Sequence, residues 1–315
     1  MHRIHVTDMR TFKRCRRKWF YVNQGLVPRK TSPGPLWFGV GIHYCLEKYY
    51  HRNRLYTPAD WWNEYVNKVS MPIDEDFQDK LEELTDLANH MLDGYFTYDG
   101  THHDWDEVIG IEYELTAKIP GTIVTLVGTA DLVVIRNGRV WAVDHKTASS
   151  FPNDRELELD DQMTAYLWLM QEGIFNPAGV VYNVLRKSIP GTPEILQSGQ
   201  LSKRVIDTTP EVYINTVLNM GLTVADYQDV IDKLKGKEFF RREKVTRSRR
   251  QLQAFGEIIA PQLREMTSKN TAIYPHKIND CAWDCPYLDL CRCTDDKGDV
   301  NYTRNALYQV VGRRR

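Results

Sequence analysis

The sequence predicts an α/β fold in which helices accompany a sheet that is locally antiparallel. Apolar residues recur at helical spacing over 36–100, and alternating or apolar runs typical of strands follow over 107–148. A further helix and a buried strand come next. A chain of 315 residues with ordinary apolar and charged content can bury a core of this size. We therefore expect one domain over 1–315, with a helical segment over 36–100 and a central core over 107–188.

Composition limits the class of protein. The formal net charge is −1, and the sequence contains no run of about 18 apolar residues that could span a membrane. Residues 1–5 lack the apolar stretch of a signal peptide, so we expect a cytoplasmic protein without membrane insertion. Basic residues gather over 10–18 and 233–250, either as phosphate-binding patches or as solvated helix faces.

The first predicted element is a short basic helix. Thr7 can cap its start, and Met9 and Phe12 form its apolar side. Cys15 is then expected on this helix or just after it.

A second helix is predicted over 37–50. Cys45 falls on its apolar stripe and is expected in the core, because a free cysteine behaves as a small hydrophobe. His43 lies one position off the stripe, where it can face a cleft from the helix edge or have a purely structural role. Helices that open at Pro58 and extend over 79–98 are expected to be scaffold.

From residue 107 the pattern changes to the alternation of a strand. One face is expected to carry Ile109, Ile111, Tyr113 and Leu115, and the other Glu112 and Glu114. After a turn at Pro120 and Gly121, a second strand over 123–135 leads to Asn137-Gly138. This pair accepts the positive φ angles of a tight hairpin turn.

The predicted hairpin brings ionisable side chains together. On its returning strand, Asp144 and Lys146 project from one face, while Val143 and His145 project from the other. Asp131, late in the outgoing strand, can approach Asp144. Two carboxylates beside a lysine on rigid strands can hold a hard divalent cation and a polarised water, although single acidic residues beside strands are commonly solvated.

A helix is predicted over 160–170, because it has an acidic first turn and Gly173 follows its end. Gln162 and Tyr166, four residues apart, are neighbours on one face of this helix. The remaining elements are a buried strand over 180–185, a helix opening at 208–211, an extended segment over 238–245 and a helix over 247–266. The basic tail 312–315 is expected to be disordered.

Three short patterns occur in a fixed order on strand, strand and helix. They are Gly128-x-x-Asp131, Asp144-x-Lys146-Thr147 and Gln162-x-x-x-Tyr166. This combination resembles the PD-(D/E)XK nuclease superfamily, and most closely its RecB-like branch, which includes AddB-type nucleases and CRISPR-associated RecB-like exonucleases. The resemblance implies a restriction-endonuclease-like core over 107–188, which is a mixed central sheet flanked by helices, with helical additions. Its upstream histidine would be His43, within Gly39-Val40-Gly41-Ile42-His43.

The negative charge of a phosphodiester determines the roles expected of these residues. The phosphate repels a hydroxide nucleophile, so cleavage needs cations on the phosphate. Asp131 and Asp144 would bind Mg²⁺ or Mn²⁺, helped by the backbone carbonyl of His145 and the imidazole of His43. Imidazole predicts a preference for Mn²⁺. Lys146 would orient the attacking water or stabilise charge in the transition state.

Three further residues are candidates for the same site. Gln162 and Tyr166 would position the nucleic-acid strand through hydrogen bonds. Glu112 is a further candidate that acts from its strand face towards the metal region, and its alternative is a solvated strand residue.

The cysteines indicate a second metal site rather than disulfides, as expected in a cytosolic chain. The pattern Cys15, Cys281, Cys285 and Cys291 resembles the iron–sulfur site of AddB-type nucleases, with one cysteine before the nuclease motifs and three after them. The C-x3-C gap is one residue longer than the commoner spacing, and Cys293 is an additional candidate. Four thiolates suit Zn²⁺ or a [4Fe–4S] cluster, and the resemblance favours the cluster. Residue 15 and residues 281–293 would then tie the two ends of the chain together.

The resulting expectation is a metal-dependent DNA nuclease, a single-strand exonuclease with 5′-to-3′ polarity, in recombination, repair or replication. Its substrate would be single-stranded DNA ends, and a helicase or recombination protein is a candidate partner, since the sequence has no P-loop motor motif. The alternatives are a structure-specific or restriction-type endonuclease and a non-catalytic DNA-end-binding accessory protein.

Overall fold

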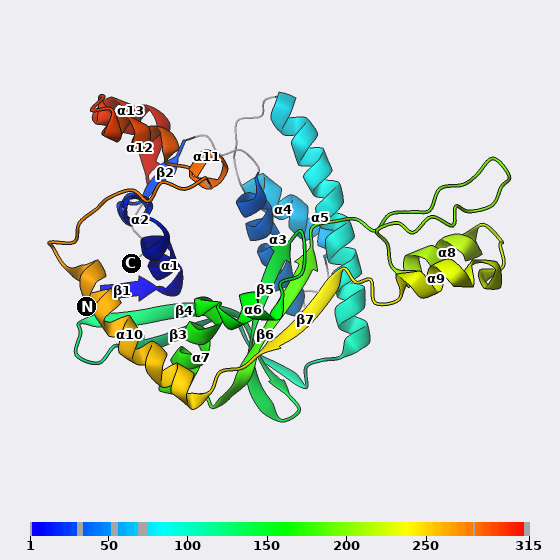
Figure 1. Cartoon of the computed structure of the whole chain (residues 1–315), viewed down its shortest axis with the longest axis horizontal. Coiled ribbons are helices and arrows are strands. Elements are labelled where there is room, and N and C mark those ends of the chain that lie inside the picture. The colour runs from blue at the N-terminus through cyan, green and yellow to red at the C-terminus, as the bar shows by residue number, and fades with distance from the viewer. Residues whose placement is uncertain (1, 30–33, 52–55, 69–74, 280, 312–315) are drawn as a thin grey trace.

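A sheet with helices on both faces forms the centre of the molecule (Figure 1). The computed structural model describes residues 2–29, 34–51, 56–68, 75–279 and 281–311. The tail 312–315 lies outside these residues. This architecture confirms the predicted α/β fold with a mixed sheet.

Within the described residues, the main sheet has six strands in the order β1-β4-β5-β6-β7, with β3 also paired to β4. The β1–β4 and β5–β6 pairs are parallel, and the β3–β4, β4–β5 and β6–β7 pairs are antiparallel. The strand bounds are β1 (His2–His5), β3 (Glu107–Lys118), β4 (Val124–Arg136), β5 (Arg139–Ala148), β6 (Pro177–Arg186) and β7 (Phe240–Val245).

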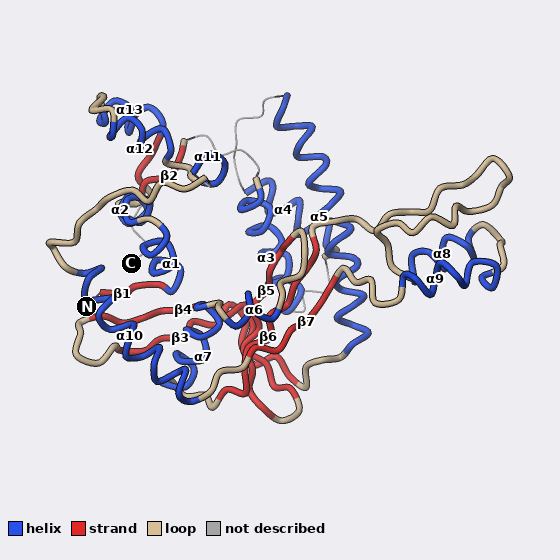
Figure 2. The backbone as a smooth tube through the Cα atoms, viewed as in Figure 1, coloured by secondary structure: helices blue, strands red, loops and turns tan. Residues whose placement is uncertain are grey.

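Each face of the sheet packs against its own group of helices (Figure 2). One hydrophobic cluster joins the strands to α1 (Val6–Arg14), α7 (Asp161–Glu172) and α10 (Arg249–Thr267). The other joins them to α3 (Pro35–Tyr50), α4 (Pro58–Lys68) and α5 (Glu75–His102). Neighbouring residues along a strand alternate between these clusters, as Ala142 and Val143 do on β5.

The hairpin predicted around Asn137 and Gly138 is confirmed, because φ is 50° at Asn137 and 67° at Gly138. At the N-terminus, the predicted cap at Thr7 is wrong, and the predicted place of Cys15 just after the first helix is confirmed. Helix α1 starts at Val6 after His5, and Thr7 lies inside its first turn. Cys15 adopts an extended backbone that ends α1 and begins α2 (Arg16–Asn23), so it lies between two helices.

The expected alternation of β3 is wrong, because the strand is irregular at two points. A bulge between Val108 and Gly110 shifts the register and leaves Ile109 37% exposed. Near Glu112, which has a φ of 46°, the strand changes faces. Ile111 therefore packs with α3 and α5, whereas Tyr113 packs in the cluster below α7.

Two smaller units extend from this core. Between β6 and β7, a projecting lobe contains α8 (Pro210–Asn219), the 3₁₀ helix η1 (Val224–Tyr227) and α9 (Gln228–Leu234), with its own small core (Figure 1). The C-terminal unit comprises α11 (Cys281–Asp284), α12 (Leu288–Asp295), α13 (Val300–Leu307) and β8 (Tyr308–Val310), which pairs with β2 (Leu26–Pro28). The short helix α6 (Asp154–Glu158) follows β5. No helix in the described part of the chain has the length and apolarity needed to cross a membrane.

Candidate functional site

The site lies where the pairing partner along one edge of β4 changes from β1 to β5. Residues His2–His5 of β1 pair with this strand up to Val127, and β5 pairs with it from Leu132 onwards. Residues 128–131 lie between these two ladders. At this interruption of the ladder, the side chain of Asp131 replaces a backbone acceptor. Its Oδ2 accepts a hydrogen bond from the backbone N–H of His145 at 2.5 Å. The carboxylate is thus fixed between β4 and β5.

Asp144 and Lys146 project from the same face of β5, as predicted. Lys146 Nζ lies 2.7 Å from Asp144 Oδ2. Burial raises the pKa of Asp144, the charge of Asp131 raises it further, and Lys146 only partly offsets these effects. Although burial disfavours the charged form of Lys146, the Asp144 carboxylate raises its pKa, so the ammonium stays charged at neutral pH.

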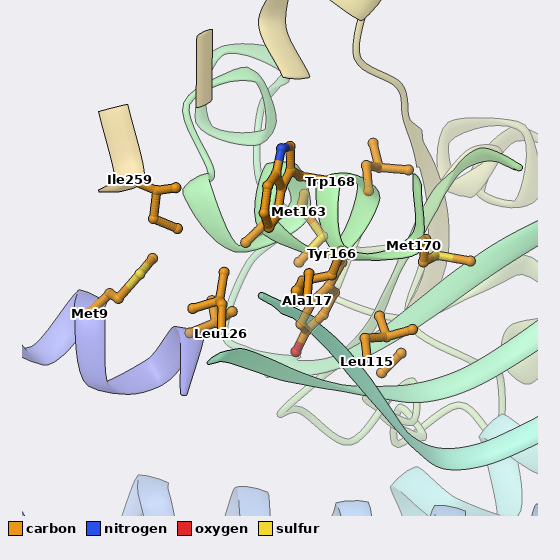
Figure 3. Packing of buried hydrophobic residues seen from close by; sticks show 14 of the residues in the cluster. Met9, Leu115, Ala117, Leu126, Met163, Tyr166, Trp168, Met170 and Ile259 are labelled. Atoms are coloured by element: carbon orange, nitrogen blue, oxygen red, sulfur yellow. The ribbon is translucent and has the colours of Figure 1, made fainter. Parts of the chain in front are cut away.

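Helix α7 supplies the predicted glutamine and tyrosine. Gln162 Nε2 donates hydrogen bonds to Asp144 Oδ1 at 3.2 Å and to the Tyr166 hydroxyl at 2.7 Å. Figure 3 shows Tyr166 reaching from α7 towards the strands. The ring needs the missing side chain of Gly128, because a Cβ there would lie 3.0 Å from Tyr166 Cε1. This contact gives a steric reason for glycine at the start of the Gly-x-x-Asp pattern.

His43 and Glu112 complete the acidic end of the site. One donor atom from each of His43, Glu112 and Asp131 lies within 4.8 Å of the other two. Glu112 faces Asp131 across the two strands, since it lies between the registered pairs Ile111–Leu132 and Tyr113–Ala130. His43 reaches the site from the edge of α3, and its Nδ1 is 3.0 Å from Asp131 Oδ1. Asp144 is not part of this three-donor group.

The three donors respond differently to burial. Burial opposes ionisation of Asp131, but the charge and hydrogen bond of His43 keep its pKa below the usual range. Burial disfavours the charged imidazole, yet Asp131 raises the pKa of His43. Glu112 is exposed to solvent on its strand, yet partial desolvation and the charge of Asp131 raise the pKa of its carboxyl to about 7. Carboxylates with strongly perturbed pKa values, grouped around a histidine, are typical of a site that binds a cation.

The side chain of His145 lies on the α3 side of β5, where its ring meets the edge of the His43 ring with centroids 6.2 Å apart. Its ring stacks on Tyr50 with centroids 5.7 Å apart, and Asn183 Nδ2 lies 2.7 Å from its Nδ1. Burial lowers its pKa to about 3, so the imidazole is neutral. The side chain therefore supports β5 from the α3 side, and the role of the His145 carbonyl as a metal ligand stays a prediction.

A comparison with protein-family models identifies the family of the chain. The model of the PD-(D/E)XK nuclease superfamily matches residues 3–292. The chain belongs to the PD-(D/E)XK nuclease superfamily. Membership implies a metal-dependent nuclease that acts on DNA, and the strands that carry Asp131 and Asp144 lie inside the matched region.

Comparisons with other proteins are less informative. A search of curated protein sequences gives no match to this nuclease. Among solved structures, the protein designated SSO0001 has a TM-score of 0.35 at 12% identity, with 92% of this chain and 85% of that chain covered. VC1899 from Vibrio cholerae has a TM-score of 0.21 at 10% identity, with coverages of 68% and 60%. Family membership therefore rests on the family model.

The nuclease also gathers the predicted cysteines. Cys15, Cys281, Cys285 and Cys291 all line one cavity of about 540 Å³. Cys293 is absent from this lining, and its Sγ accepts a hydrogen bond from the Thr303 hydroxyl at 3.3 Å. Cys45 is fully buried in the α3 core, as predicted, and burial raises the pKa of its thiol to about 12.

The sequence interpretation missed one residue that contacts the predicted site. Arg10 on α1 donates from Nη1 to Gln162 Oε1 at 2.6 Å. Its membership of the basic cluster over 10–18 was evident, and it lies on the polar side of α1, since Met9 and Phe12 are buried. Nothing local in the sequence connects it with Gln162, which follows 152 residues later.

Proposed function

We propose that this nuclease digests single-stranded DNA from an end and that the β4–β5 hairpin carries its catalytic centre. The observation that carries the proposal is the three-donor group of His43, Glu112 and Asp131 beside the Lys146–Asp144 ion pair. A cation-binding group next to a half-buried, charged lysine is the arrangement that phosphodiester hydrolysis requires.

The donor set fits a hard divalent cation. One imidazole nitrogen and two carboxylate oxygens are available within 4.8 Å, which suits Mn²⁺ and Mg²⁺, and the imidazole favours Mn²⁺. We assign Asp144 and the His145 carbonyl as additional ligands. When bound, the cation supplies positive charge for the phosphate and lowers the pKa of a coordinated water.

The remaining side chains act directly on water and substrate. Lys146 is kept charged by Asp144, so its ammonium can donate hydrogen bonds to an attacking water or to a phosphate oxygen. The side-chain amide of Gln162 donates hydrogen bonds both to the Asp144 carboxylate and to the Tyr166 hydroxyl. These contacts limit the movement of Asp144 while the strand is positioned.

We further propose that the cysteine cavity holds a [4Fe–4S] cluster, bound by Cys15, Cys281, Cys285 and Cys291. The four cysteines that line the cavity suit either this cluster or a tetrahedral Zn²⁺, and the order of the cysteines along the chain supports the cluster.

Donors around the sulfurs also support thiolate ligands. The backbone N–H groups of Lys18 and His276 each lie 3.4 Å from Cys15 Sγ, and Arg17 Nη1 lies 3.3 Å from Cys291 Sγ. Such N–H donors stabilise negative charge on sulfur.

The finer assignment is a RecB-like, AddB-type exonuclease with 5′-to-3′ polarity that acts in DNA recombination, repair or replication. The order of the motif residues and the placement of the cysteines support it. Because the sequence contains no P-loop motif, a partner helicase would supply any unwinding.

The test is digestion of single strands labelled at the 5′ or 3′ end, with Mn²⁺ or Mg²⁺. We expect Asp131→Asn and Lys146→Ala each to lower the rate by about 10³-fold or more, because each removes charge needed in the transition state. Asp229→Asn and Lys203→Ala, which alter an exposed ion pair in the projecting lobe, should keep full activity.

Three outcomes would change the assignment. Full activity in the purified Asp131→Asn or Lys146→Ala protein would exclude this catalytic centre. Cleavage of closed circles would identify an endonuclease. Binding of DNA ends without cleavage by the unmodified protein would identify an accessory protein.

A further inference from the structure

We infer that Arg10 binds the substrate phosphate next to the scissile one, in a groove that holds single-stranded DNA between α1 and the start of α7. This inference rests on the proposed nuclease function. It assigns a role to a residue outside the three family patterns.

The position of Arg10 follows from its contact with Gln162. Its Nη1 lies 2.6 Å from Gln162 Oε1, and Lys146 Nζ lies 3.4 Å from the same oxygen. Arg10 and Lys146 are therefore separated by a single acceptor atom. A strand with one phosphate at Lys146 brings its next phosphate close to Arg10.

The charges at this point favour an anion. Lys146 is paired with Asp144, whereas no carboxylate within ion-pair distance of Arg10 occurs in the part of the chain that the structure describes. The shared amide oxygen of Gln162 is neutral, so it leaves the guanidinium charge uncompensated. Among the described residues, Gln162 takes one of the five guanidinium N–H donors, and the other four can bind a phosphate in the two-pronged geometry that arginine favours.

The surrounding groove has room for a strand. A pocket of about 820 Å³ lies between the N-terminal helices and the α6–α7 segment, lined by Arg10, Lys13 and Arg14 of α1 and by Lys18 of α2. Its opposite wall contains three acidic residues, Glu156, Asp160 and Asp161.

The acidic residues of this wall already have partners. Glu156 accepts a hydrogen bond from the Asn153 N–H at 2.8 Å, and Asp160 caps α7 by accepting from the Gln162 N–H at 2.7 Å. Asp161 is paired with Lys13 at 2.6 Å. Helix-capping carboxylates are compensated by the helix N-terminus, so they repel a phosphate less than free carboxylates do.

Beyond Asp160 the groove becomes aromatic. A second pocket of about 370 Å³ shares Glu156 and Asp160 with the first and is lined by Phe151 and Tyr182. Tyr182 lies opposite Asp144 in the β5–β6 register. Aromatic rings next to a cationic wall suit a single strand, because its unpaired bases can stack.

The decisive experiment measures binding and cleavage separately. In an Asp131→Asn background, which removes cleavage, Arg10→Gln should weaken binding of a fluorescein-labelled 20-nucleotide single strand about tenfold at low salt. The slope of log Kd against log salt should fall in magnitude by about 0.7, the value for one lost phosphate contact. In the active enzyme, KM should rise about tenfold while kcat changes less than threefold.

Two further variants separate charge from packing. Arg10→Lys keeps the charge and should keep the salt slope. Lys203→Gln, in the projecting lobe on the other side of the molecule from α1 (Figure 1), should change neither slope nor KM.

Other results would overturn the inference. A lower kcat in Arg10→Gln with unchanged slope and KM would mean that Arg10 only positions Gln162. Failure of the unmodified protein to bind single strands would overturn it as well. If the unmodified protein binds strands with the expected Arg10 dependence but never cleaves them, the proposed nuclease function alone fails.

Discussion

At Glu112 the backbone leaves the β region in the middle of a strand. A φ of 46° is uncommon for a residue with a side chain, and such positions persist only where the surrounding structure holds them. Here the residue lies opposite Asp131, at the point where β3 changes the face that it presents. The conformation directs a carboxylate to His43 and Asp131, and the raised pKa of Glu112 shows that this placement disfavours its charge in the absence of a cation.

These pKa values predict how the metal-free protein responds to pH. Glu112 and Asp144 have raised pKa values, so the folded state holds more protons than the unfolded chain between about pH 4.5 and 7. His43 also has a raised pKa, and its contribution to stability is lost as pH rises through that value. All three effects lower the free energy of unfolding of the metal-free protein as pH rises from about 5 to 8. The lowered pKa of His145 acts in the opposite direction up to about pH 6.5, so the net fall is expected between about pH 6.5 and 8.

A bound cation should oppose this trend. We expect Mn²⁺ at a hundredfold excess over its Kd to add about 2.7 kcal/mol at pH 8 and less at pH 5.5, where protons compete for the carboxylates. Thermal unfolding with and without Mn²⁺ at both values of pH measures the effect. Glu112→Gln should weaken Mn²⁺ binding and reduce the dependence on pH, and equal stabilisation by Mn²⁺ at both values would contradict the assignment of these donors.

At the scale of elements, the packing of α3 against α4 determines where His43 lies. Gly41 is the contact point, because a Cβ there would lie 2.6 Å from Trp62 Cζ3 and 2.6 Å from Tyr65 Cε1. Both rings are buried and have little room to move. The close approach of α3 and α4 thus explains why residue 41 is glycine, and its backbone angles do not.

Gly41→Ala should therefore cost about 1–3 kcal/mol, the usual penalty for overpacking a core. Because His43 is on the same helix, Mn²⁺ affinity should fall with stability. Gly100→Ala on α5 is the matched control, since nothing lies within 4 Å of its added methyl group, and it should be neutral or stabilising by up to about 1 kcal/mol. Denaturant unfolding and Mn²⁺ titration of both variants provide the comparison, and equal behaviour of the two would exclude the steric explanation.

At the scale of the whole molecule, segments from both ends of the chain share one unit. Arg17 on α2 is paired with Asp295 on α12 at 2.6 Å, and the Tyr21 ring packs against Tyr287 in a tilted contact with centroids 5.4 Å apart. Cys15 adds a sulfur to the cavity formed by the C-terminal cysteines. A metal centre there closes a very long loop and restricts the unfolded chain. Because α1 ends at Cys15, the same centre supports the helix that carries Arg10.

We expect anaerobically purified protein to be brown, with visible charge-transfer absorption. Ala variants at positions 15, 281, 285 or 291 should lose the colour and about 3 kcal/mol of stability, comparable to the loss of a cross-link that closes a long loop. Cys293→Ala and Cys45→Ala are the controls and should keep the absorption. Visible spectra and metal analysis decide the question, and a colourless preparation containing zinc would rule out the iron–sulfur cluster.

The sequence alone determined the parts of the molecule that depend on near neighbours in the chain. Turn chemistry explains the hairpin at Asn137 and Gly138. The helical period places Gln162 and Tyr166 on one face of α7, and the strand period points Asp144 and Lys146 in the same direction. The order of the motif residues was sufficient to suggest the family, and the family model confirms the superfamily.

Only the tertiary structure decided how these pieces meet. The pairing of β1 with β4 interrupts the ladder next to Asp131, the left-handed backbone at Glu112 redirects β3, and α1 brings Arg10 to Gln162. It also separates Cys293 from the other cysteines of the C-terminal unit. These features depend on contacts between elements far apart in the sequence, whose relative positions are set by burial of shared surfaces and not by local conformational preference.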